Sequence, residues 1–376
     1  MTSVPLDLEC TPGCCVADMT DSTSPTDAPA TTPLATSPLG RTGPFVSRLG
    51  LGTMTFGVET DESESFAQLD AFVAAGGTFI DTADGYGAGE AERIVGRWRA
   101  DRRPDEVVLA TKGRFSPPPG SAGASRRSLV RSVDASLDRL GVDAIDLYFV
   151  HGWDQHTPVV ETLDTLAGLV RSGKIHSIGW SNVTGYQLGE ILTEARHGGL
   201  IAPCVVQPQY NLLDRNIELE VLACCIDRGR SITPWSPLGG GWLTGKYARD
   251  TRPTGESRLG DDPDRGVEAY DGRNTARTFD VIDAVRSVAE RHGGSMGQVA
   301  IAWLLTRPTV ASVLLGARTG AQLSDNPGAA SVALDAADVD QLTRISAPGV
   351  PPYPYGMIEN FCDVPHWRDL GTHRPV

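Results

Sequence analysis

The chain has no long hydrophobic run, no excess of positive charge and no regular spacing of cysteines. Its 376 residues contain no apolar stretch of about 18 residues, the minimum for a membrane-spanning helix. The 33 Lys and Arg are outnumbered by 47 Asp and Glu, and the formal net charge is −14. Because nucleic-acid phosphates are neutralised by clustered Lys and Arg, this composition argues against nucleic acid as a partner. We expect no membrane partner either.

The cysteines also argue against a disulfide framework. They number seven, an odd count, which is not typical of a disulfide-stapled secreted domain. Cys10, Cys14 and Cys15 lie close together, but structural zinc usually takes four ligands, so we expect no metal. The first residues lack a basic start followed by an apolar segment, so no signal peptide is predicted, and Met19 is a second candidate start. The predicted location is the cytoplasm.

Composition divides the chain into three parts. Residues 1–42 are rich in Thr, Ser, Pro and Ala and are predicted to be a disordered tail. Residues 43–346 repeat one pattern, in which a short β-branched run and a turn precede an amphipathic helix. Residues 347–376 form an aromatic and Pro-rich C-terminal tail. This tail could cover the mouth of the domain or pack against its outer helices.

The repeated segment contains eight strand-like runs and seven helical patterns. The runs are mostly continuous and apolar, which favours a parallel sheet buried on both faces. They lie at 48–54, 77–83, 106–113, 144–152, 175–182, 203–209, 230–237 and 310–317. The helical patterns lie at 64–76, 90–100, 126–141, 158–173, 185–198, 217–229 and 278–293.

Eight such strands in one α/β domain predict a (β/α)8 TIM barrel. The rival is a doubly wound open sheet, which would show a G-x-G-x-x-G turn after its first strand. The sequence at that place does not fit this spacing. One segment, from Pro237 to Asn274, breaks the pattern without clear periodicity. Because it follows the seventh strand at the face where barrel active sites lie, we expect a lid over a substrate or cofactor.

In a TIM barrel, residues at the carboxyl ends of the strands build the active site. Asp81, Lys112 and His151 end the second, third and fourth predicted strands, and Tyr86 follows Asp81 in a Gly-rich loop. A lysine inside a barrel mouth needs a paired carboxylate, and Asp81 is the available one. The pKa of tyrosine is near 10, and a nearby ammonium lowers it. We therefore predict proton transfer by Tyr86, a lowering of its pKa by Lys112, and a hydrogen bond from His151 to a substrate carbonyl oxygen.

None of these side chains can supply a hydride, which indicates a nicotinamide cofactor. Ser181, Asn182 and Gln207 carry the donors and acceptors that a carboxamide needs, and Tyr210 can stack on a flat ring. Arg318 lies at the start of a later helix, where anions commonly bind. Its guanidinium suits a ribose 2′-phosphate. The predicted cofactor is NADPH (NADP+).

Several short motifs stand together in one order. DTADGYG, LATKG, YFVHGWD, GKIHSIGWSN, VQPQYN, PWSPLGGGWLTGKY and GARTGAQLSDN follow one another at barrel spacing. Over residues 44–346 this set resembles the aldo-keto reductase superfamily. The resemblance implies that Asp81, Tyr86, Lys112 and His151 form a catalytic tetrad with Tyr86 as proton donor. It implies cofactor contacts for Ser181, Asn182, Gln207, Tyr210, Ser236, Leu238, Gly239, Leu243, Lys246, Gly316, Arg318, Gln322 and Asn326.

Two tryptophans are candidates for the substrate pocket. Trp153 follows His151, as in the branch that looks similar to aryl-alcohol dehydrogenases. It could stack on a flat or sugar-ring substrate, or simply fill the barrel rim. Trp242 stands where the family more often has Leu or Phe, a difference that bears on the shape of the pocket.

The leading interpretation is an NADPH-dependent aldo-keto reductase that converts an aldehyde or ketone reversibly into the alcohol. Within the same class, the lid and tail leave room for a ketoreductase of a nucleotide-linked deoxysugar or a secondary-metabolite intermediate. From another class, the superfamily also includes cofactor-binding regulatory subunits, which have no need of Tyr86 and Lys112 together. A barrel aldolase would need Lys112 with a lowered pKa for a Schiff base, which Asp81 opposes.

Overall fold

A computed structural model describes residues 34–104, 106–115, 122–255 and 257–362. The predicted disorder of residues 1–33, the cysteines of that segment and residues 363–376 of the C-terminal tail lie outside the described residues. Strands β1 (Thr36–Pro38) and β2 (Phe45–Ser47) pair as an antiparallel hairpin. Ordered structure therefore begins before the predicted boundary at residue 42. The reason is packing, because the side chain of Leu39 is fully buried against the barrel strands.

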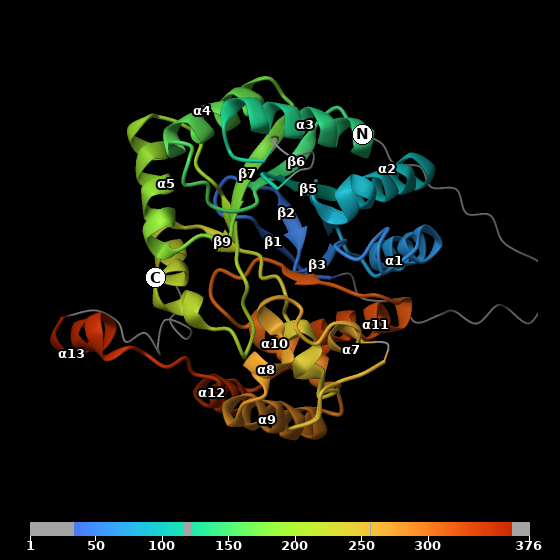
Figure 1. The fold of residues 1–376 in the computed structure, drawn as a ribbon, viewed down its shortest axis with the longest axis vertical. Helices are drawn as coiled ribbons and strands as arrows, with labels where there is room; N and C mark the ends of the chain where they lie inside the picture. The colour runs from blue at the N-terminus through green and yellow to red at the C-terminus, as the bar shows by residue number, and fades with distance from the viewer. Residues whose placement is uncertain (1–33, 105, 116–121, 256, 363–376) are drawn as a thin grey trace, which may run out of the picture. The chain divides into compact units, whose positions relative to one another are not determined.

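Eight parallel strands form the central sheet, and each lies within one of the predicted strand-like runs. They are β3 (Leu49–Gly52), β4 (Phe79–Asp81), β5 (Val108–Gly113), β6 (Ile145–Val150), β7 (Ile175–Ser181), β8 (Val205–Gln207), β9 (Ser231–Ile232) and β10 (Val313–Leu315). Their hydrogen-bonded order is β10-β3-β4-β5-β6-β7-β8-β9. The edges β9 and β10 also meet, since the N–H of Leu314 in β10 donates to the carbonyl of Pro234, two residues after β9, at 3.0 Å. The sheet therefore curls into the predicted (β/α)8 barrel (Figure 1).

The strands are buried on both faces, as their continuous apolar runs predicted. Phe79, Leu147 and Phe149 pack in one apolar cluster with Leu39 and Val46 from the β1–β2 hairpin. The alternating residues of the same strands belong to a second cluster that includes the surrounding helices. The hairpin therefore fills the end of the barrel opposite the predicted site.

Helices surround the barrel, and α1 to α5 follow one another around the sheet in chain order (Figure 1). Their bounds are α1 (Glu62–Ala74), α2 (Glu90–Arg102), α3 (Arg126–Leu140), α4 (Val159–Arg171), α5 (Gly185–His197), α6 (Val221–Arg228), α9 (Ala276–His292), α10 (Met296–Leu305), α11 (Gly320–Asp325) and α12 (Ala336–Ile345). Side-chain caps fix several starts: Ser125 accepts from the third residue of α3, and Thr184 forms a capping box with Gln187 of α5.

Helices α6 and α10 differ from the sequence prediction. The helix predicted at 217–229 is divided into a 3-10 turn (Asn216–Leu219) and α6, because Glu220 has a non-helical φ of −140°. The turn is held by a buried ion pair between Arg215 and Glu218 at 2.7 Å. Helix α10, which periodicity did not single out, is buried around most of its circumference. It therefore lacks the polar face that makes a helix recognisable from sequence.

The predicted lid folds into short elements. After the 3-10 segment Gly239–Thr244 come α7 (Arg258–Asp261), a 3-10 turn at Gly266–Glu268 and α8 (Tyr270–Arg273). Trp242 is fully buried among them, stacked on Tyr270 with ring centroids 5.5 Å apart. Its indole N–H donates to the carbonyl of Glu268 at 3.1 Å. The lid therefore has a small core of its own, which periodicity could not reveal.

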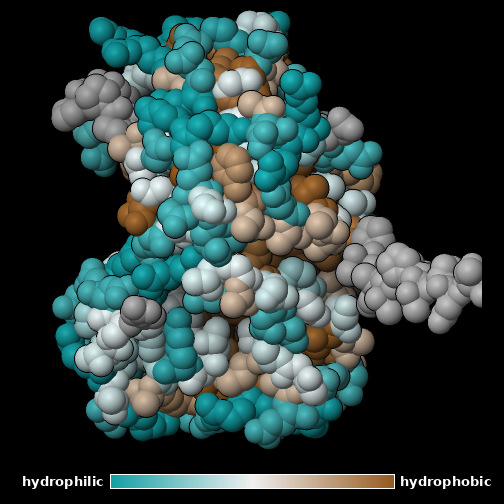
Figure 2. All heavy atoms as spheres, turned by 90° about the vertical axis from the view of Figure 1, so that its right-hand side faces the viewer, coloured by the Kyte–Doolittle hydropathy of each residue, from teal (hydrophilic) through white to brown (hydrophobic). Residues whose placement is uncertain are grey.

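The described part of the C-terminal tail ends in a short helix, α13 (Met357–Phe361). The hydroxyl of Tyr355 donates to Glu220, at the start of α6, at 2.6 Å. None of the described helices is long and apolar enough to cross a membrane. The face drawn in Figure 2 is mostly hydrophilic, with apolar residues in small separate groups.

Candidate active site

The ends of β4, β5 and β6 bring three predicted site residues onto one face of the sheet. Asp81 lies level with Ala110, and Lys112 lies level with Phe149. Side chains two residues apart on a strand point to the same face. Asp81, Lys112 and His151 therefore project with Ala110 and Phe149 toward the inside of the barrel, as the prediction required.

Lys112 and Asp81 form a buried ion pair. The Lys112 Nζ donates to Asp81 Oδ2 at 2.5 Å, and the two side chains are 0% and 3% exposed. Nζ also donates to the carbonyl of Thr82 at 2.8 Å, and Gln207 Nε2 donates to the other Asp81 oxygen at 2.9 Å. Burial opposes the charge of Lys112, but the negative charge of Asp81 favours it, and the net pKa of Lys112 is raised. Lys112 is therefore a fixed cation rather than a Schiff-base nucleophile.

Tyr86 reaches Lys112 from the loop that follows β4. Its hydroxyl lies 3.3 Å from Lys112 Nζ. The backbone turns back after Tyr86 through positive φ angles of 54° at Gly87 and 89° at Gly89, a conformation that glycine adopts without strain. Burial raises the pKa of Tyr86, Lys112 lowers it by less, and the net pKa is raised. The predicted lowering by Lys112 is therefore present but is outweighed by burial, and Tyr86 keeps its proton at neutral pH.

His151 stands beside Tyr86, edge to face, with ring centroids 5.9 Å apart. Burial, followed by the positive charges of Lys112 and Arg114, lowers the pKa of His151 to about 3. The imidazole is therefore neutral at physiological pH and can donate an N–H hydrogen bond without serving as the acid. Its main-chain carbonyl accepts from Asn182 Nδ2 at 2.9 Å, which holds the end of β6 to the end of β7.

The residues predicted to hold a carboxamide lie beside these groups, at the ends of β7 and β8. The hydroxyl of Ser181 donates to the main-chain carbonyl of Gln207 at 2.7 Å. Asn182 Oδ1 accepts from the indole N–H of Trp235 at 3.2 Å. Ser181 is thus joined through Gln207 to Asp81, whereas Asn182 is joined to His151.

Tyr210 does not point toward the site at the ends of β7 and β8. It is fully buried, its hydroxyl donates to Glu218 at 2.6 Å, and its ring packs against Trp303 with centroids 5.7 Å apart. Trp235 is instead partly exposed at the end of the β9 segment, next to Asn182. The sequence analysis did not assign Trp235 a role, although its position immediately before Ser236 at a strand end is a signal that could have identified it.

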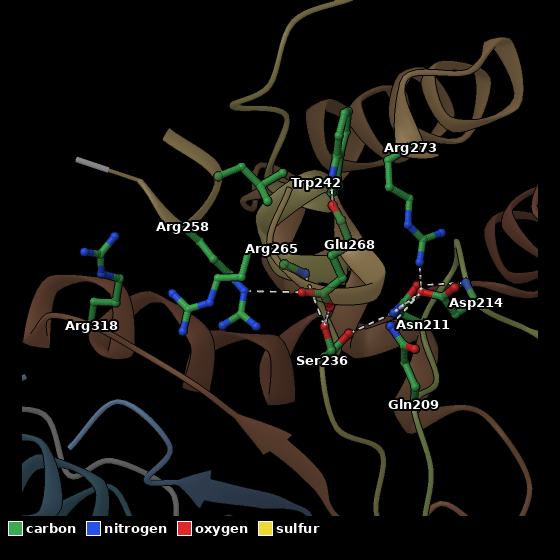
Figure 3. A network of polar contacts seen from close by, with 12 residues as sticks. Gln209, Asn211, Asp214, Ser236, Trp242, Arg258, Arg265, Glu268, Arg273 and Arg318 are labelled. Carbon is green, nitrogen blue, oxygen red and sulfur yellow. Dashed lines mark hydrogen bonds and ion pairs between the residues drawn. The ribbon is translucent and has the colours of Figure 1, made fainter. Parts of the chain in front are cut away.

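A group of cations lies along the lid. Figure 3 shows Arg258 and Arg265 near Glu268, with Arg318 farther along the same side. The Ser236 hydroxyl is hydrogen-bonded to Glu268, whose other oxygen lies 3.3 Å from Arg258 Nε. Ser236 is thus held at the start of the lid by a residue from its far end.

The positive charges of Lys246, Arg258 and Arg318 also act on one another. Partial burial, followed by the charges of Arg318 and Arg258, lowers the pKa of Lys246. Arg318 pairs with Glu59 at 3.0 Å and with Asp261 of α7 at 2.9 Å. Mutually repelling cations on a protein of net charge −14 make a local positive field suited to a polyanion. The donor set therefore fits a pyrophosphate-bearing cofactor.

Among the remaining predicted cofactor residues, Gln322 contacts this cationic region. The main-chain N–H of Arg318 donates to Gln322 Oε1 at 2.9 Å. Of the others, Leu243 and Asn326 are buried, Gly316 is exposed, and Leu238 and Gly239 lie at the start of the lid.

The two predicted pocket tryptophans have different surroundings. Trp153 is partly exposed just past His151, 6.4 Å from the ring of Tyr186, itself 68% exposed. This position at the rim leaves an aromatic surface available. Trp242 is enclosed in the lid core, where it packs against Tyr247 and Phe279 as well as Tyr270.

Comparison with known proteins identifies the family of the chain. Residues 48–347 match the Aldo/keto reductase family. The chain is 37% identical over 317 residues to an uncharacterized oxidoreductase, YrpG, of Bacillus subtilis, covering 79% of this chain and 91% of that protein. It is 36% identical to a probable voltage-gated potassium channel subunit beta of Oryza sativa, covering 78% and 90%. It is 33% identical to norsolorinic acid reductase B of Aspergillus parasiticus, covering 79% and 80%. The barrel, the placement of the four site residues and these similarities lead to one conclusion: the chain is an oxidoreductase of the aldo/keto reductase family.

Proposed function

We propose that the protein is an NADPH-dependent carbonyl reductase in which Tyr86 donates the proton. The observation that carries this proposal is the chain of contacts from Asp81 through Lys112 to Tyr86 beside a neutral His151. A protonated phenol next to a fixed ammonium can give up its proton to an alkoxide, and the ammonium then stabilises the phenolate. Asp81 contributes by keeping Lys112 charged inside the barrel.

The substrate carbonyl oxygen would lie between Tyr86 and His151. Reduced nicotinamide, when bound, supplies the hydride for the carbonyl carbon. The His151 N–H can polarise the carbonyl, and the Tyr86 hydroxyl can protonate the oxygen as it becomes an alkoxide. Because both groups converge on one oxygen, the site favours carbonyl reduction over proton abstraction from carbon.

The cofactor would be held by residues on both sides of this site. Ser181, Asn182 and Gln207 would bind the carboxamide, and Trp235 is a better stacking surface than Tyr210 because it is exposed beside Asn182. Lys246, Arg258 and Arg318 suit the phosphates. Arg318 would take the 2′-phosphate of NADPH in exchange for one of its carboxylate partners, Glu59 or Asp261.

The test is to follow NADPH absorbance across a panel of aryl aldehydes, aliphatic aldehydes and keto-sugars. We expect NADPH oxidation with at least one class and formation of the matching alcohol. Oxidation with the keto-sugars alone would support a deoxysugar ketoreductase, the second substrate class that the lid leaves room for. No oxidation with any carbonyl would refute the reductase. It would favour a cofactor-binding regulatory subunit; the relative from Oryza sativa is named as a probable voltage-gated potassium channel subunit beta.

A further inference from the structure

A cation without an acidic partner lies at the mouth of the proposed site. Arg114 follows β5, two residues after Lys112, and is partly buried. Its Nε is buried without a hydrogen-bond partner. Within the ranges that the structure describes, its guanidinium makes no ion pair, and it lies against the ring of Phe115, 4.7 Å from Cζ to centroid. A buried N–H donor without an acceptor costs free energy unless a ligand supplies the acceptor.

The nearby carboxylate, Asp154, is already occupied by other donors. One of its oxygens accepts from the N–H of Ala124 at 2.8 Å and from the hydroxyl of Thr157 at 2.9 Å. The other accepts from the N–H of His156 at 3.0 Å. Asp154 therefore organises the loops at this rim, and it does not neutralise Arg114 by direct contact.

The backbone at Arg114 is strained. Its φ is 124°, a region that residues with a side chain rarely occupy. Such conformations persist where the direction of a side chain matters for function. The strand end is held in place on either side, since the N–H of Gly123 donates to the Arg114 carbonyl at 2.9 Å and the N–H of His151 donates to Gly113 at 2.9 Å.

An aromatic wall connects Arg114 to the reacting groups. The ring of Phe115 lies 5.0 Å from the ring of His151, and 48% of Phe115 is exposed. Gly152 keeps this wall open, because a Cβ there would lie 3.2 Å from the Phe115 ring. Phe115 therefore lies against both the ring of His151 and the guanidinium of Arg114.

We propose that Arg114 binds a carboxylate on the substrate, so that the site takes an aromatic aldehyde or ketone carrying an acidic group. The carbonyl would lie at Tyr86 and His151, the ring against Phe115, and the carboxylate on the guanidinium. A guanidinium binds a carboxylate through two parallel hydrogen bonds. On a protein of net charge −14, an anionic substrate needs such a local cation. This proposal rests on the reductase function proposed above.

The experiment compares 4-carboxybenzaldehyde and its 3-isomer with their methyl esters, which have a similar size but no charge. The ester group withdraws more electron density than the carboxylate, so intrinsic reactivity toward hydride favours the ester and a preference for the acid must come from binding. We expect kcat/KM of the wild-type protein to favour at least one acid over its ester by tenfold or more. In Arg114→Gln this ratio should fall at least tenfold from the wild-type value through a higher KM for the acid, while Arg114→Lys should keep part of the preference. Arg131→Gln, at an exposed position on α3, is the matched control and should keep the wild-type ratio.

A binding measurement keeps the test independent of turnover. The product alcohols, the hydroxymethylbenzoates, are titrated against tryptophan fluorescence and compared with their methyl esters. Weaker binding of the acids to Arg114→Gln, with no change for Arg131→Gln, would support the proposal even if no aldehyde is reduced. The proposal would be overturned if the wild-type protein bound the acids and their esters with equal affinity. It would also be overturned if Arg114→Gln weakened the binding of both by the same factor.

Discussion

The buried ion pair between Asp81 and Lys112 makes the sharpest energetic prediction. Asp81→Asn keeps the shape and the hydrogen bond from Gln207 but leaves Lys112 as an uncompensated buried charge. Because the side chains are 3% and 0% exposed, solvent screening does little to reduce the cost. Removing one partner of such a pair costs about 3–5 kcal/mol. We expect the free energy of unfolding, measured by urea titration, to fall by about that amount.

The pH dependence of stability should change as well. In the wild-type protein the raised pKa of Lys112 stabilises the fold at every pH below about 10.4, the value in the unfolded chain. That stabilisation is lost only as the pH rises through the higher folded value. In Asp81→Asn, burial, the largest influence on the pKa of Lys112, is no longer opposed by the charge of Asp81 and should lower that pKa below the unfolded value. The variant should therefore become more stable as the pH rises through the alkaline range up to about 10.4.

Two control variants make the unfolding measurement specific to the buried ion pair. Asp134→Asn removes a surface partner of Lys174, a pair with 49% and 41% exposed side chains, and should cost less than about 1 kcal/mol. Asp81→Asn combined with Lys112→Met removes both charges and should recover part of the lost stability without restoring turnover. The reasoning would be refuted if Asp81→Asn cost no more than Asp134→Asn and its stability did not respond to pH.

Two further predictions concern the residue that stacks on the cofactor and the N-terminal hairpin. Trp235→Ala should weaken NADPH binding by about 1 kcal/mol, roughly fivefold, whereas Tyr210→Phe should lower the melting temperature and leave NADPH affinity unchanged. Fluorescence titration with NADPH measures both affinities. Weaker NADPH binding by Tyr210→Phe, with no change for Trp235→Ala, would restore Tyr210 as the stacking residue. Deleting residues 1–40 should lower the free energy of unfolding by about 2–5 kcal/mol through loss of the buried Leu39. Deleting residues 1–33 should leave the free energy of unfolding unchanged. Equal melting temperatures for the two truncated chains would contradict the stabilising role of the hairpin.

The barrel and the four site residues could be predicted because local pattern encodes them. A strand buried on both faces must be apolar throughout, and this made all eight strands recognisable from β3 to β10. Polar residues at the ends of such strands have few structural uses, so Asp81, Lys112 and His151 stood out together. The resemblance of the motifs to one family then placed Tyr86 with them.

The features that sequence could not supply depend on burial and on distant contacts. Lys112 does lower the pKa of Tyr86, but how far burial opposes it became visible only with the fold. Tyr210 and Trp235 both follow polar strand ends, and only the buried partner Glu218 shows that Tyr210 points into the core. In the same way, Leu39 lies in a compositionally disordered segment and is ordered by the barrel that it packs against.

The central claim is that Tyr86 donates the proton for carbonyl reduction. Tyr86→Phe removes the hydroxyl while keeping the ring beside His151, and a general acid contributes about 10²–10⁴-fold to the rate. In a stopped-flow experiment at saturating NADPH and aldehyde, the account predicts normal NADPH binding and NADPH oxidation slower by about that factor. Oxidation at the wild-type rate by Tyr86→Phe would contradict it.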